Sequence, residues 1–344
     1  MKINLDLPLL EKIFNIDSPT GYTKGIIDYL EEVVKELGYP TERNKKGNLI
    51  VTVKGKTDYT LGLSAHVDTL GLMVRSIMPS GHLRFTMIGG LLLPTLDGEY
   101  CRVHTRDGKV YTGTILSTSP SVHVYKDSRS KTRDEDNMYI RLDENVKNKK
   151  DTLALGINNG DIVAVEPKFT FTESGYIKTR FLDDKASVFI LLTYLRMLKE
   201  EEKTPECTLK VIFTTYEEVG HGASQVPYMD ELLAIDMGCI GTDLECTEEQ
   251  VSICAKDAGG PYDYEMTSKL IELAKENKLN YAVDIYPFYS SDATAALRAG
   301  ADIKGALIGA GIHASHGMER THVEGIINTI KLIEAYVDNI KKDN

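Results

Sequence analysis

The sequence predicts a mixed-sheet α/β domain that is interrupted by a smaller β-rich domain. Residues 1–70 read as a helix followed by strands, and the last of these strands runs into polar residues. Residues 71–165 consist of short alternating runs separated by turn residues. From residue 166 onward, apolar strands alternate with amphipathic helices again. We therefore expect a discontinuous α/β domain of residues 1–70 and 166–344, with a small β-barrel or sandwich inserted at 71–165.

Composition excludes several classes of partner. The chain has 344 residues, 40 Lys plus Arg against 51 Asp plus Glu, and a formal net charge of -11. This balance argues against a broad basic face for nucleic acid. The N-terminus lacks the features of a secretory signal, and the apolar runs are too short to span a bilayer. The five cysteines are scattered without a CxxC pair, which fits reduced thiols. We expect a cytoplasmic protein that binds neither nucleic acid nor membrane.

The first α/β segment predicts one helix and two strands. Apolar residues recur at helical spacing over residues 21–38, and Gly38 ends that pattern. LIVTVKG (49–55) is rich in β-branched residues and follows the turn-like KKGN. LGLSAHVDTLG (61–71) is a mostly apolar strand that ends in polar residues. This order of elements predicts that the polar residues after the strand form a functional site at the carboxyl edge of a sheet.

The insert has a different pattern. RDGK (106–109) lies between two alternating runs and predicts a hairpin. A charged piece near 145–155 has some helical character. After the insert we expect the following elements: a buried helix at 186–195, a strand at 208–215 that runs into two acids, a short strand at 232–236 ending in Asp236, a helix at 268–279, a strand at 302–311 and a C-terminal helix at 324–342.

Side chains that bind metals recur directly after apolar runs. They are His66 and Asp68, Asp183 and Asp184 (interpreted as the end of a strand), Glu217 and Glu218, Asp236, and the histidines His313, His316 and His322. Imidazole nitrogens and carboxylate oxygens suit Zn, Co or Mn, and a carboxylate can bridge two ions. So many acids would be costly to bury together without a cation. Their joint occurrence therefore indicates a dinuclear metal site.

The motifs around these residues resemble those of the M42 family of metallo-aminopeptidases. AHVDTLG resembles the family's AHxDExG, FLDDKAS its LDDRxG, TTYEEVGHGAS its QEEVGLRGA and AIDMG its VDV segment. Further segments, including CRVHTRDGKVYTGTI and NTIKLIEAYV, resemble family segments in the same order. The resemblance covers nearly the whole chain.

The resemblance implies an aminopeptidase that removes N-terminal residues from short peptides through a metal-bridging hydroxide. It implies two divalent ions per chain, Zn or Co, with Mn as a further candidate. The roles it implies are as follows: His66, Glu218, Asp236 and one C-terminal histidine as terminal ligands, Asp183 as the bridging ligand, Glu217 as the general base, and Asp68 as the partner that hydrogen-bonds His66. It also implies a cis peptide bond between Asp183 and Asp184.

Some positions depart from the family's pattern or stay open. Thr69 replaces an acid of the family, and Lys185 replaces an arginine. We expect these changes to alter the surroundings of the metal ligands rather than to abolish activity. The last ligand is either His316 or His322, and the register of the preceding strand and following helix favours His316. The roles of four further residues are left open: His123, His221, Ser291 and Asp292, the last two of which could simply begin a helix.

Two other functions compete with the aminopeptidase. One is an N-acyl amino acid deacylase of the same clan, and the other is a catalytically silent metal-binding scaffold. Glu217 argues against the scaffold, because a scaffold has no need of a second acid beside Glu218. The family uses the β-rich insert to build tetrahedral dodecamers, so the resemblance also implies that residues 71–165 are an oligomerisation domain of a large closed homo-oligomer.

Overall fold

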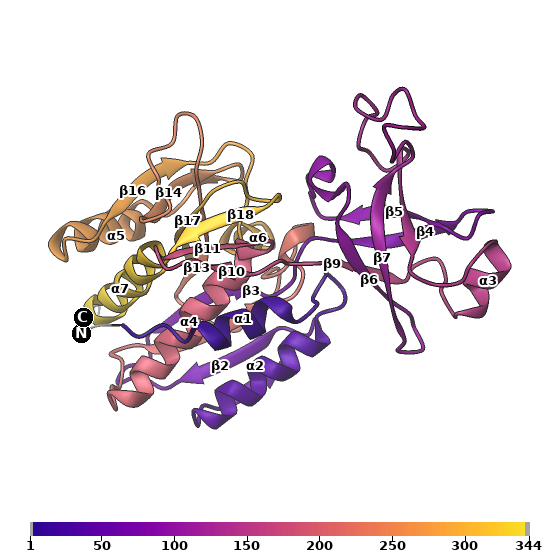
Figure 1. Cartoon of the computed structure of the whole chain (residues 1–344). Helices are drawn as coiled ribbons and strands as arrows, with labels where there is room; N and C mark the ends of the chain where they lie inside the picture. The colour runs from indigo at the N-terminus through magenta and orange to yellow at the C-terminus, as the bar shows by residue number, and fades with distance from the viewer. Residues whose placement is uncertain (1–2, 341–344) are drawn as a thin grey trace. The chain divides into compact units, whose positions relative to one another are not determined.

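The structure, a computed structural model, describes residues 3–340 and divides into two compact units. The first unit contains the residues up to Asp68 and those from Lys168 onward, and the second contains Thr69–Pro167. The first is built on a large mixed sheet, and the second contains a closed antiparallel barrel (Figure 1). The predicted fold class, a mixed-sheet α/β domain with a small β-barrel, is confirmed.

A nine-stranded sheet forms the centre of the first unit. Its order is β1-β2-β12-β3-β13-β17-β14-β15, and β16 pairs with β14. β12, β3, β13 and β17 run parallel, so their carboxyl ends lie at one edge. The strands are β1 (Thr41–Arg43), β2 (Leu49–Val53), β3 (Thr60–His66), β12 (Thr208–Thr214), β13 (Glu231–Cys239), β14 (Val251–Asp257), β15 (Gly260–Pro261), β16 (Tyr281–Ile285) and β17 (Lys304–Ile312).

Helices pack against both faces of this sheet. Leu61 and Leu63 of β3 join the core formed with α1, α2, α4, α5 and α7, whereas Leu232 and Ala234 of β13 join a second core with α6. Because both faces are covered, the central strands are almost entirely buried. The helices are α1 (Leu7–Asn15), α2 (Lys24–Glu36), α4 (Leu182–Glu200), α5 (Tyr264–Glu276), α6 (Asp292–Arg298) and α7 (Val323–Asn339).

Three short elements complete the first unit around the site. A three-stranded sheet has the order β10-β11-β18, and a 3₁₀ turn, η2, follows β12. Their bounds are β10 (Thr170–Phe171), β11 (Tyr176–Thr179), β18 (Glu319–His322) and η2 (Glu217–Val219).

Most predicted elements of the first unit are present, with some corrections. The helix predicted at 21–38 is α2, and the one at 186–195 is the middle of α4. α7 is the predicted C-terminal helix, of which residues 341–342 lie outside the described part of the chain. Two interpretations were wrong. β13 does not end at Asp236 but continues to Cys239, because Met237–Cys239 still pair with β17.

The second wrong interpretation concerns the aspartate pair. Asp183 and Asp184 do not end a strand, since β11 ends at Thr179 and the pair lies in the first turn of α4. The backbone of both residues is non-helical there. The aspartate pair, which a long apolar run follows, therefore marks the start of a helix and not the end of a strand.

The second unit is the closed barrel, with the order β4-β5-β8-β7-β6-β9. RDGK forms the predicted hairpin, in which His104 pairs with Val110. The short helix α3 (Lys149–Ala154) confirms the helical piece predicted near 145–155. The barrel strands are β4 (Gly71–Ile77), β5 (Leu83–Ile88), β6 (Tyr100–His104), β7 (Val110–Ser117), β8 (Met138–Leu142) and β9 (Ile162–Val165), and a 3₁₀ turn, η1 (Leu93–Leu96), precedes β6.

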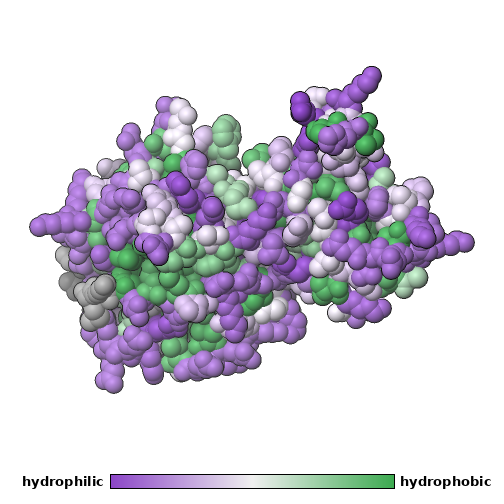
Figure 2. Space-filling model, viewed as in Figure 1, coloured by the Kyte–Doolittle hydropathy of each residue, from purple (hydrophilic) through white to green (hydrophobic). Residues whose placement is uncertain are grey.

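The surface is mostly hydrophilic on the face that Figure 2 shows, with smaller hydrophobic patches among the polar residues. Within residues 3–340, no helix combines the length and the apolar character needed to cross a bilayer.

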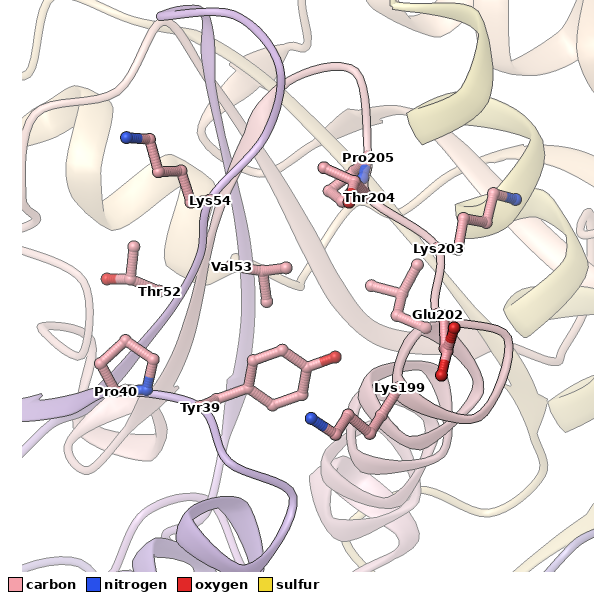
Figure 3. Close-up of a pocket in the computed structure, with 11 residues that line it drawn as sticks. Tyr39, Pro40, Thr52, Val53, Lys54, Lys199, Glu202, Lys203, Thr204 and Pro205 are labelled. Atoms are coloured by element: carbon pink, nitrogen blue, oxygen red, sulfur yellow. The ribbon is translucent and has the colours of Figure 1, made fainter.

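A pocket of about 690 Å³ lies in the first unit (Figure 3). It is lined by Tyr39, Val53, Lys199 and Pro205 among others. Val53 is the last residue of β2 and pairs with Leu209 near the start of β12. The pocket therefore lies at the amino ends of the parallel strands, at the edge of the sheet opposite to the one where His66 lies.

Candidate active site

Three parallel strands bring candidate ligands to one edge of the sheet. His66 is the last residue of β3 and pairs with Thr214, the last residue of β12. Glu217 and Glu218 follow Thr214 in η2. β13 pairs with β3 in a register that brings Asp236 level with His66. Sequence order and sheet topology together therefore gather one imidazole and three carboxylates.

The imidazole of His66 is buried and held in one orientation. Its Nδ1 lies 2.8 Å from the carbonyl oxygen of Asp68, which can only accept a hydrogen bond, so Nδ1 carries a proton. Its Nε2 faces three carboxylates: Asp183 Oδ1 at 3.1 Å, Glu217 Oε2 at 3.7 Å and Asp236 Oδ2 at 4.0 Å. Nε2 therefore faces the carboxylates, where it shares a proton with Asp183 and, once deprotonated, would offer its lone pair to a metal ion.

Asp183 lies between two histidines. Its Oδ1 is 3.1 Å from His66 Nε2, and its Oδ2 is 3.5 Å from His316 Nε2. The Oε2 atom of Glu218 is 3.7 Å from the same nitrogen of His316. Each oxygen of one carboxylate therefore faces a different imidazole, which is the arrangement that a ligand bridging two ions needs.

The backbone that carries Asp183 and His316 is held in an unusual conformation. Phe181 has φ +68° and His316 has φ +64°, in the left-handed region that is uncommon for residues other than glycine. The peptide bond between Asp183 and Asp184 is cis, as the resemblance implied. The buried carboxylate of Glu319 accepts hydrogen bonds from the backbone N–H groups of Asp183 (3.1 Å) and His316 (2.9 Å). Glu319 thus joins the two segments.

His322 and His313 lie away from this cluster. His322 is in β18, where its Nε2 lies 2.9 Å from the carbonyl oxygen of Ser174 and its Nδ1 accepts the N–H of Glu324. The side chain therefore caps α7. His313 is exposed and forms an isolated bridge with Arg320. Of the three C-terminal histidines, His316 is the one beside Asp183.

Asp68 contacts the site in two ways. Its carbonyl oxygen orients His66, while its carboxylate lies 3.6 Å from the ring. The same carboxylate accepts the hydroxyl of Thr20 (2.7 Å) and the backbone N–H groups of Glu217 (3.1 Å) and Glu218 (3.3 Å). Asp68 is fully buried. Its hydrogen bonds to the two backbone N–H groups fix the turn that carries both glutamates.

Packing these acids together raises most of their pKa values. Burial is the main cause for Glu217 and Glu218, whose pKa values lie well above the usual range, and neighbouring carboxylates add to it. Burial and the charge of Asp183 raise the pKa of Asp236 to about 7. Burial would lower the pKa of His66, but the hydrogen bond to Asp183 and the surrounding acids raise it well above its usual value. The cluster therefore has an excess of negative charge that protons partly neutralise.

The donor set fits a divalent cation. Two groups each have ligand atoms within 4.8 Å of one another: His66, Glu217 and Asp236, and His66, Asp183 and Glu218. Glu218 Oε1 is buried without a hydrogen-bond partner among the described residues. Nitrogen and carboxylate donors of this kind bind Zn, Co or Mn, and a cation would stabilise the ionised acids that burial disfavours. The acidic cluster can therefore hold a metal.

Chelator-treated protein is expected to lose stability as pH rises from about 5.5 to 8. The pKa values of Asp236 (about 7, against an ordinary 3.8) and Glu319 (about 8, against 4.5) are raised on folding. Between these values the folded chain binds more protons than the unfolded chain, so the free energy of unfolding falls as pH rises. The pKa of Asp183 is lowered, so the titration of this group changes the free energy of unfolding only below this pH interval.

Thermal unfolding by circular dichroism at the two pH values measures this effect. Metal-free Asp236→Asn is the matched control and should show a shallower decline, because it lacks one of the titrating carboxyl groups. A melting temperature of the metal-free wild type that rises across the interval would contradict the expectation.

The remaining candidates have mostly structural contacts. Ser291 begins α6, its hydroxyl accepting the N–H of Thr294. Asp292 is buried and accepts hydrogen bonds from Thr214 Oγ1 (2.5 Å) and Ala223 N (2.8 Å). The ring of His221 stacks on Tyr216, with centroids 5.0 Å apart. His123 is exposed in a turn of the second unit, and its N–H donates to Ser121.

The two departures from the family's pattern are both buried. Lys185 donates from Nζ to the carbonyl oxygen of Ile16 (2.6 Å), just past the end of α1. Thr69 donates its hydroxyl to the carbonyl oxygen of Leu70 (3.0 Å). Lys185 therefore ties α1 to α4.

Two residues of the site were not found by sequence reasoning. Glu319 follows a polar loop, and nothing in its neighbours marks an acid that binds two backbone N–H groups. Tyr289 lies just before the noted Ser291–Asp292 segment, and its phenol is buried near Asp236. The nearness of Tyr289 to that segment was the available signal.

The chain is similar to known peptidases over nearly its whole length. The family model described as M42 glutamyl aminopeptidase matches residues 47–332. The chain is 46% identical over 336 residues to "Putative aminopeptidase YhfE" of Bacillus subtilis (strain 168), with 97% of each chain covered. The TET aminopeptidase of a marine sediment Thaumarchaeota archaeon shares the fold with a TM-score of 0.89 at 19% identity, covering 98% of this chain and 97% of that one.

A further solved structure extends this similarity. The Pyrococcus horikoshii TET1 peptidase has a TM-score of 0.85 at 25% identity, covering 97% of this chain and 99% of that one. The family model matches well over half of the chain, and the Bacillus relative is similar over 97% of it. The chain therefore belongs to the M42 glutamyl aminopeptidase family.

Proposed function

We propose that this chain is an aminopeptidase that uses two divalent metal ions to release the N-terminal residue of short peptides. The observation that carries the proposal is the placement of Asp183, whose two carboxylate oxygens face His66 and His316. Membership of the M42 family supports peptide hydrolysis as the reaction. The imidazole and carboxylate donors suit Zn or Co, and also Mn.

The proposed ligands divide into two sets that share Asp183. His66 and Asp236 complete one set, since His66 Nε2 lies 4.0 Å from Asp236 Oδ2. Glu218 and His316 complete the other, with 3.7 Å between Oε2 and Nε2. Two bound ions supply Lewis acidity, which polarises a carbonyl group and makes water a better proton donor at neutral pH.

Glu217 is the proposed general base. Its side chain is 14% exposed, whereas that of Glu218 is 4% exposed and lies beside His316. Glu217 is therefore the more accessible of the two acids to water and substrate. It takes the proton of the attacking water and delivers it to the amine that leaves when the C–N bond breaks. Asp68 keeps the carboxylate in place by accepting the backbone N–H of Glu217.

Release of free amino acid from unblocked and N-acetylated dipeptides tests the function. We expect unblocked dipeptides to be hydrolysed, N-acetylated ones to be left intact, and activity to be lost with a strong chelator and regained with Co or Zn. Hydrolysis of the acetylated substrate alone would identify a deacylase of the same clan. Metal binding without hydrolysis of either substrate would identify a silent scaffold.

The proposal extends to the assembly and the compartment of the protein. A solved relative from Pyrococcus horikoshii is described as forming a tetrahedron or an octahedral shell. In the barrel unit, the turn residues Val122, Val124 and Tyr125 are 57%, 72% and 41% exposed, which suits a surface that another copy covers. We infer a large closed homo-oligomer that uses the insert. All five cysteines are free, which supports a cytoplasmic location.

A further inference from the structure

Glu319 is a buried acid beside the cluster, and the proposed function leaves it without a role. It is the first residue of β18 and is 2% exposed. Its Oε2 atom accepts the backbone N–H of Asp183 at 3.1 Å, and its Oε1 atom accepts the backbone N–H of His316 at 2.9 Å. One side chain therefore binds the main chain of two proposed metal ligands that are far apart in the sequence.

The N–H group of Asp183 needs an acceptor of this kind. Asp183 lies in the first turn of α4, where N–H groups lack a partner within the helix, and its backbone is non-helical there. A buried N–H group that has no acceptor costs free energy on folding. Because Glu319 supplies the acceptor, the position of the Asp183 main chain depends on where that carboxylate lies.

The loop that carries His316 is the tip of a hairpin. His313 and Arg320 pair at its base, through N–H···O bonds of 2.9 Å and 3.1 Å. Within the loop, Ala314 has φ +59° and His316 has φ +64°. This left-handed conformation is uncommon for residues that have a side chain, and it persists where the surroundings hold it. The hydrogen bond from the His316 N–H to Glu319 is one such contact.

The main chain of Glu319 is itself fixed by strand pairing. Glu319 pairs with Thr179, the last residue of β11, and the chain leads from there to Asp183. The side chain therefore extends from a sheet toward both ligand segments. A side chain that starts from a rigid element can hold ligands more precisely than contacts within a loop can.

The ligands of the other proposed set are held without Glu319. His66 is oriented by the carbonyl oxygen of Asp68 at 2.8 Å. Asp236 Oδ1 accepts the N–H of the next residue at 2.7 Å. Loss of the hydrogen bonds of Glu319 should therefore displace His316 and leave these two ligands in place.

We propose that Glu319 is a positioning residue that fixes the separation of Asp183 and His316, so that both side chains reach the same metal ion. This inference rests on the proposed two-metal function. Because each oxygen of its carboxylate binds a main-chain N–H group, Glu319 acts through these two ligands and does not bind the ion itself. The ion that depends on it is the one assigned to Glu218 and His316.

Titration of metal-free Glu319→Gln with Co²⁺ tests the proposal. Glutamine keeps the size of the side chain, but an NH₂ group replaces one acceptor oxygen, so one of the two hydrogen bonds is lost. We expect affinity for one Co²⁺ ion to fall about 10–100-fold, as for other partners of metal ligands, and affinity for the other ion to be unchanged. The visible absorption of bound Co²⁺ measures this without an activity assay. Activity lost at limiting Co²⁺ should return when the Co²⁺ concentration is raised.

Glu319→Asp separates the reach of the side chain from its charge. Aspartate keeps the negative charge, but its side chain is one methylene group shorter, so the carboxylate cannot span both N–H groups. This variant should weaken binding of the same Co²⁺ ion. It also carries the test if Glu319→Gln does not fold.

Asp284→Asn is the matched control. Asp284 is also buried, and its carboxylate accepts the backbone N–H groups of Glu245 (2.8 Å) and Cys246 (3.1 Å), neither of which is a proposed ligand. The variant should lose stability in thermal unfolding but bind both Co²⁺ ions as the wild type does. Circular dichroism verifies that each variant is folded.

Four results would overturn the proposal. Unchanged Co²⁺ affinity in Glu319→Gln would mean that Glu319 does not set the separation of the ligands. Wild-type affinity in Glu319→Asp would mean that charge alone matters. The same loss of affinity in Asp284→Asn would make the effect one of general stability. Absence of one ion from Glu319→Gln at saturating Co²⁺ would make Glu319 a ligand.

Failure of the proposed function gives a different result. A wild type that binds two Co²⁺ ions but releases no amino acid would refute the aminopeptidase. The Co²⁺ titrations would still decide the role of Glu319.

Discussion

Glu217→Gln is expected to lower kcat by about 10²–10⁴-fold, the usual effect of removing a general base. Glutamine keeps the size of the side chain but cannot accept the proton of the attacking water. The backbone N–H of residue 217 still donates to Asp68, so the turn should fold as before. Two metal ions per chain should remain bound, since Glu217 is not one of the proposed ligands.

Steady-state kinetics and metal analysis of the same preparation measure the two effects together. Glu249→Gln, at an exposed position, controls for the loss of one negative charge. Near-normal turnover of Glu217→Gln would place the base elsewhere. A loss of one metal ion would mean that Glu217 is itself a ligand. Its Oε2 lies 3.7 Å from His66 Nε2, close enough for both atoms to bind one ion.

His316→Ala is expected to lower the metal content from two ions per chain towards one, with severe loss of activity. The variant removes the nitrogen that faces both Asp183 and Glu218. His322→Ala is the matched control, because its ring bonds Ser174 and caps α7 rather than facing the cluster. It should keep two ions and lose some stability, on the order of 1 kcal/mol for a lost helix cap.

Elemental analysis of metal-loaded protein distinguishes the two variants. Two ions in His316→Ala and one in His322→Ala would reverse the assignment. Equal losses in both variants would mean that the C-terminal loop rearranges when metal binds.

The sequence predicted best those parts of the site that depend on strand ends. His66 and the glutamate pair each follow an apolar run, and parallel pairing of β3 with β12 brings such residues together in any sheet of this kind. Asp236 was recognised, although it lies within β13 and not at its end. A charged residue in a buried strand is a signal in itself, because burial of an unpaired charge is costly.

The parts that sequence reasoning missed depend on contacts between distant segments. Glu319 binds the backbone of Asp183, 136 positions away, and no local pattern encodes that contact. The start of α4 was wrongly predicted because the apolar Phe181 and Leu182 precede the aspartate pair and resemble the end of a strand. α1 was not predicted, although Asp6 caps it and a proline follows at its first turn, both of which are helix start signals.

The positions of the metal ions test the central claim most directly. A crystal structure of metal-loaded protein, with anomalous scattering measured at the metal edge, locates each ion without reference to activity. The account predicts two ions about 3.5–4 Å apart, with Asp183 between them. His66 and Asp236 should bind one ion, and Glu218 and His316 the other. A single ion, or a site in which Glu217 rather than Glu218 binds metal, would contradict it.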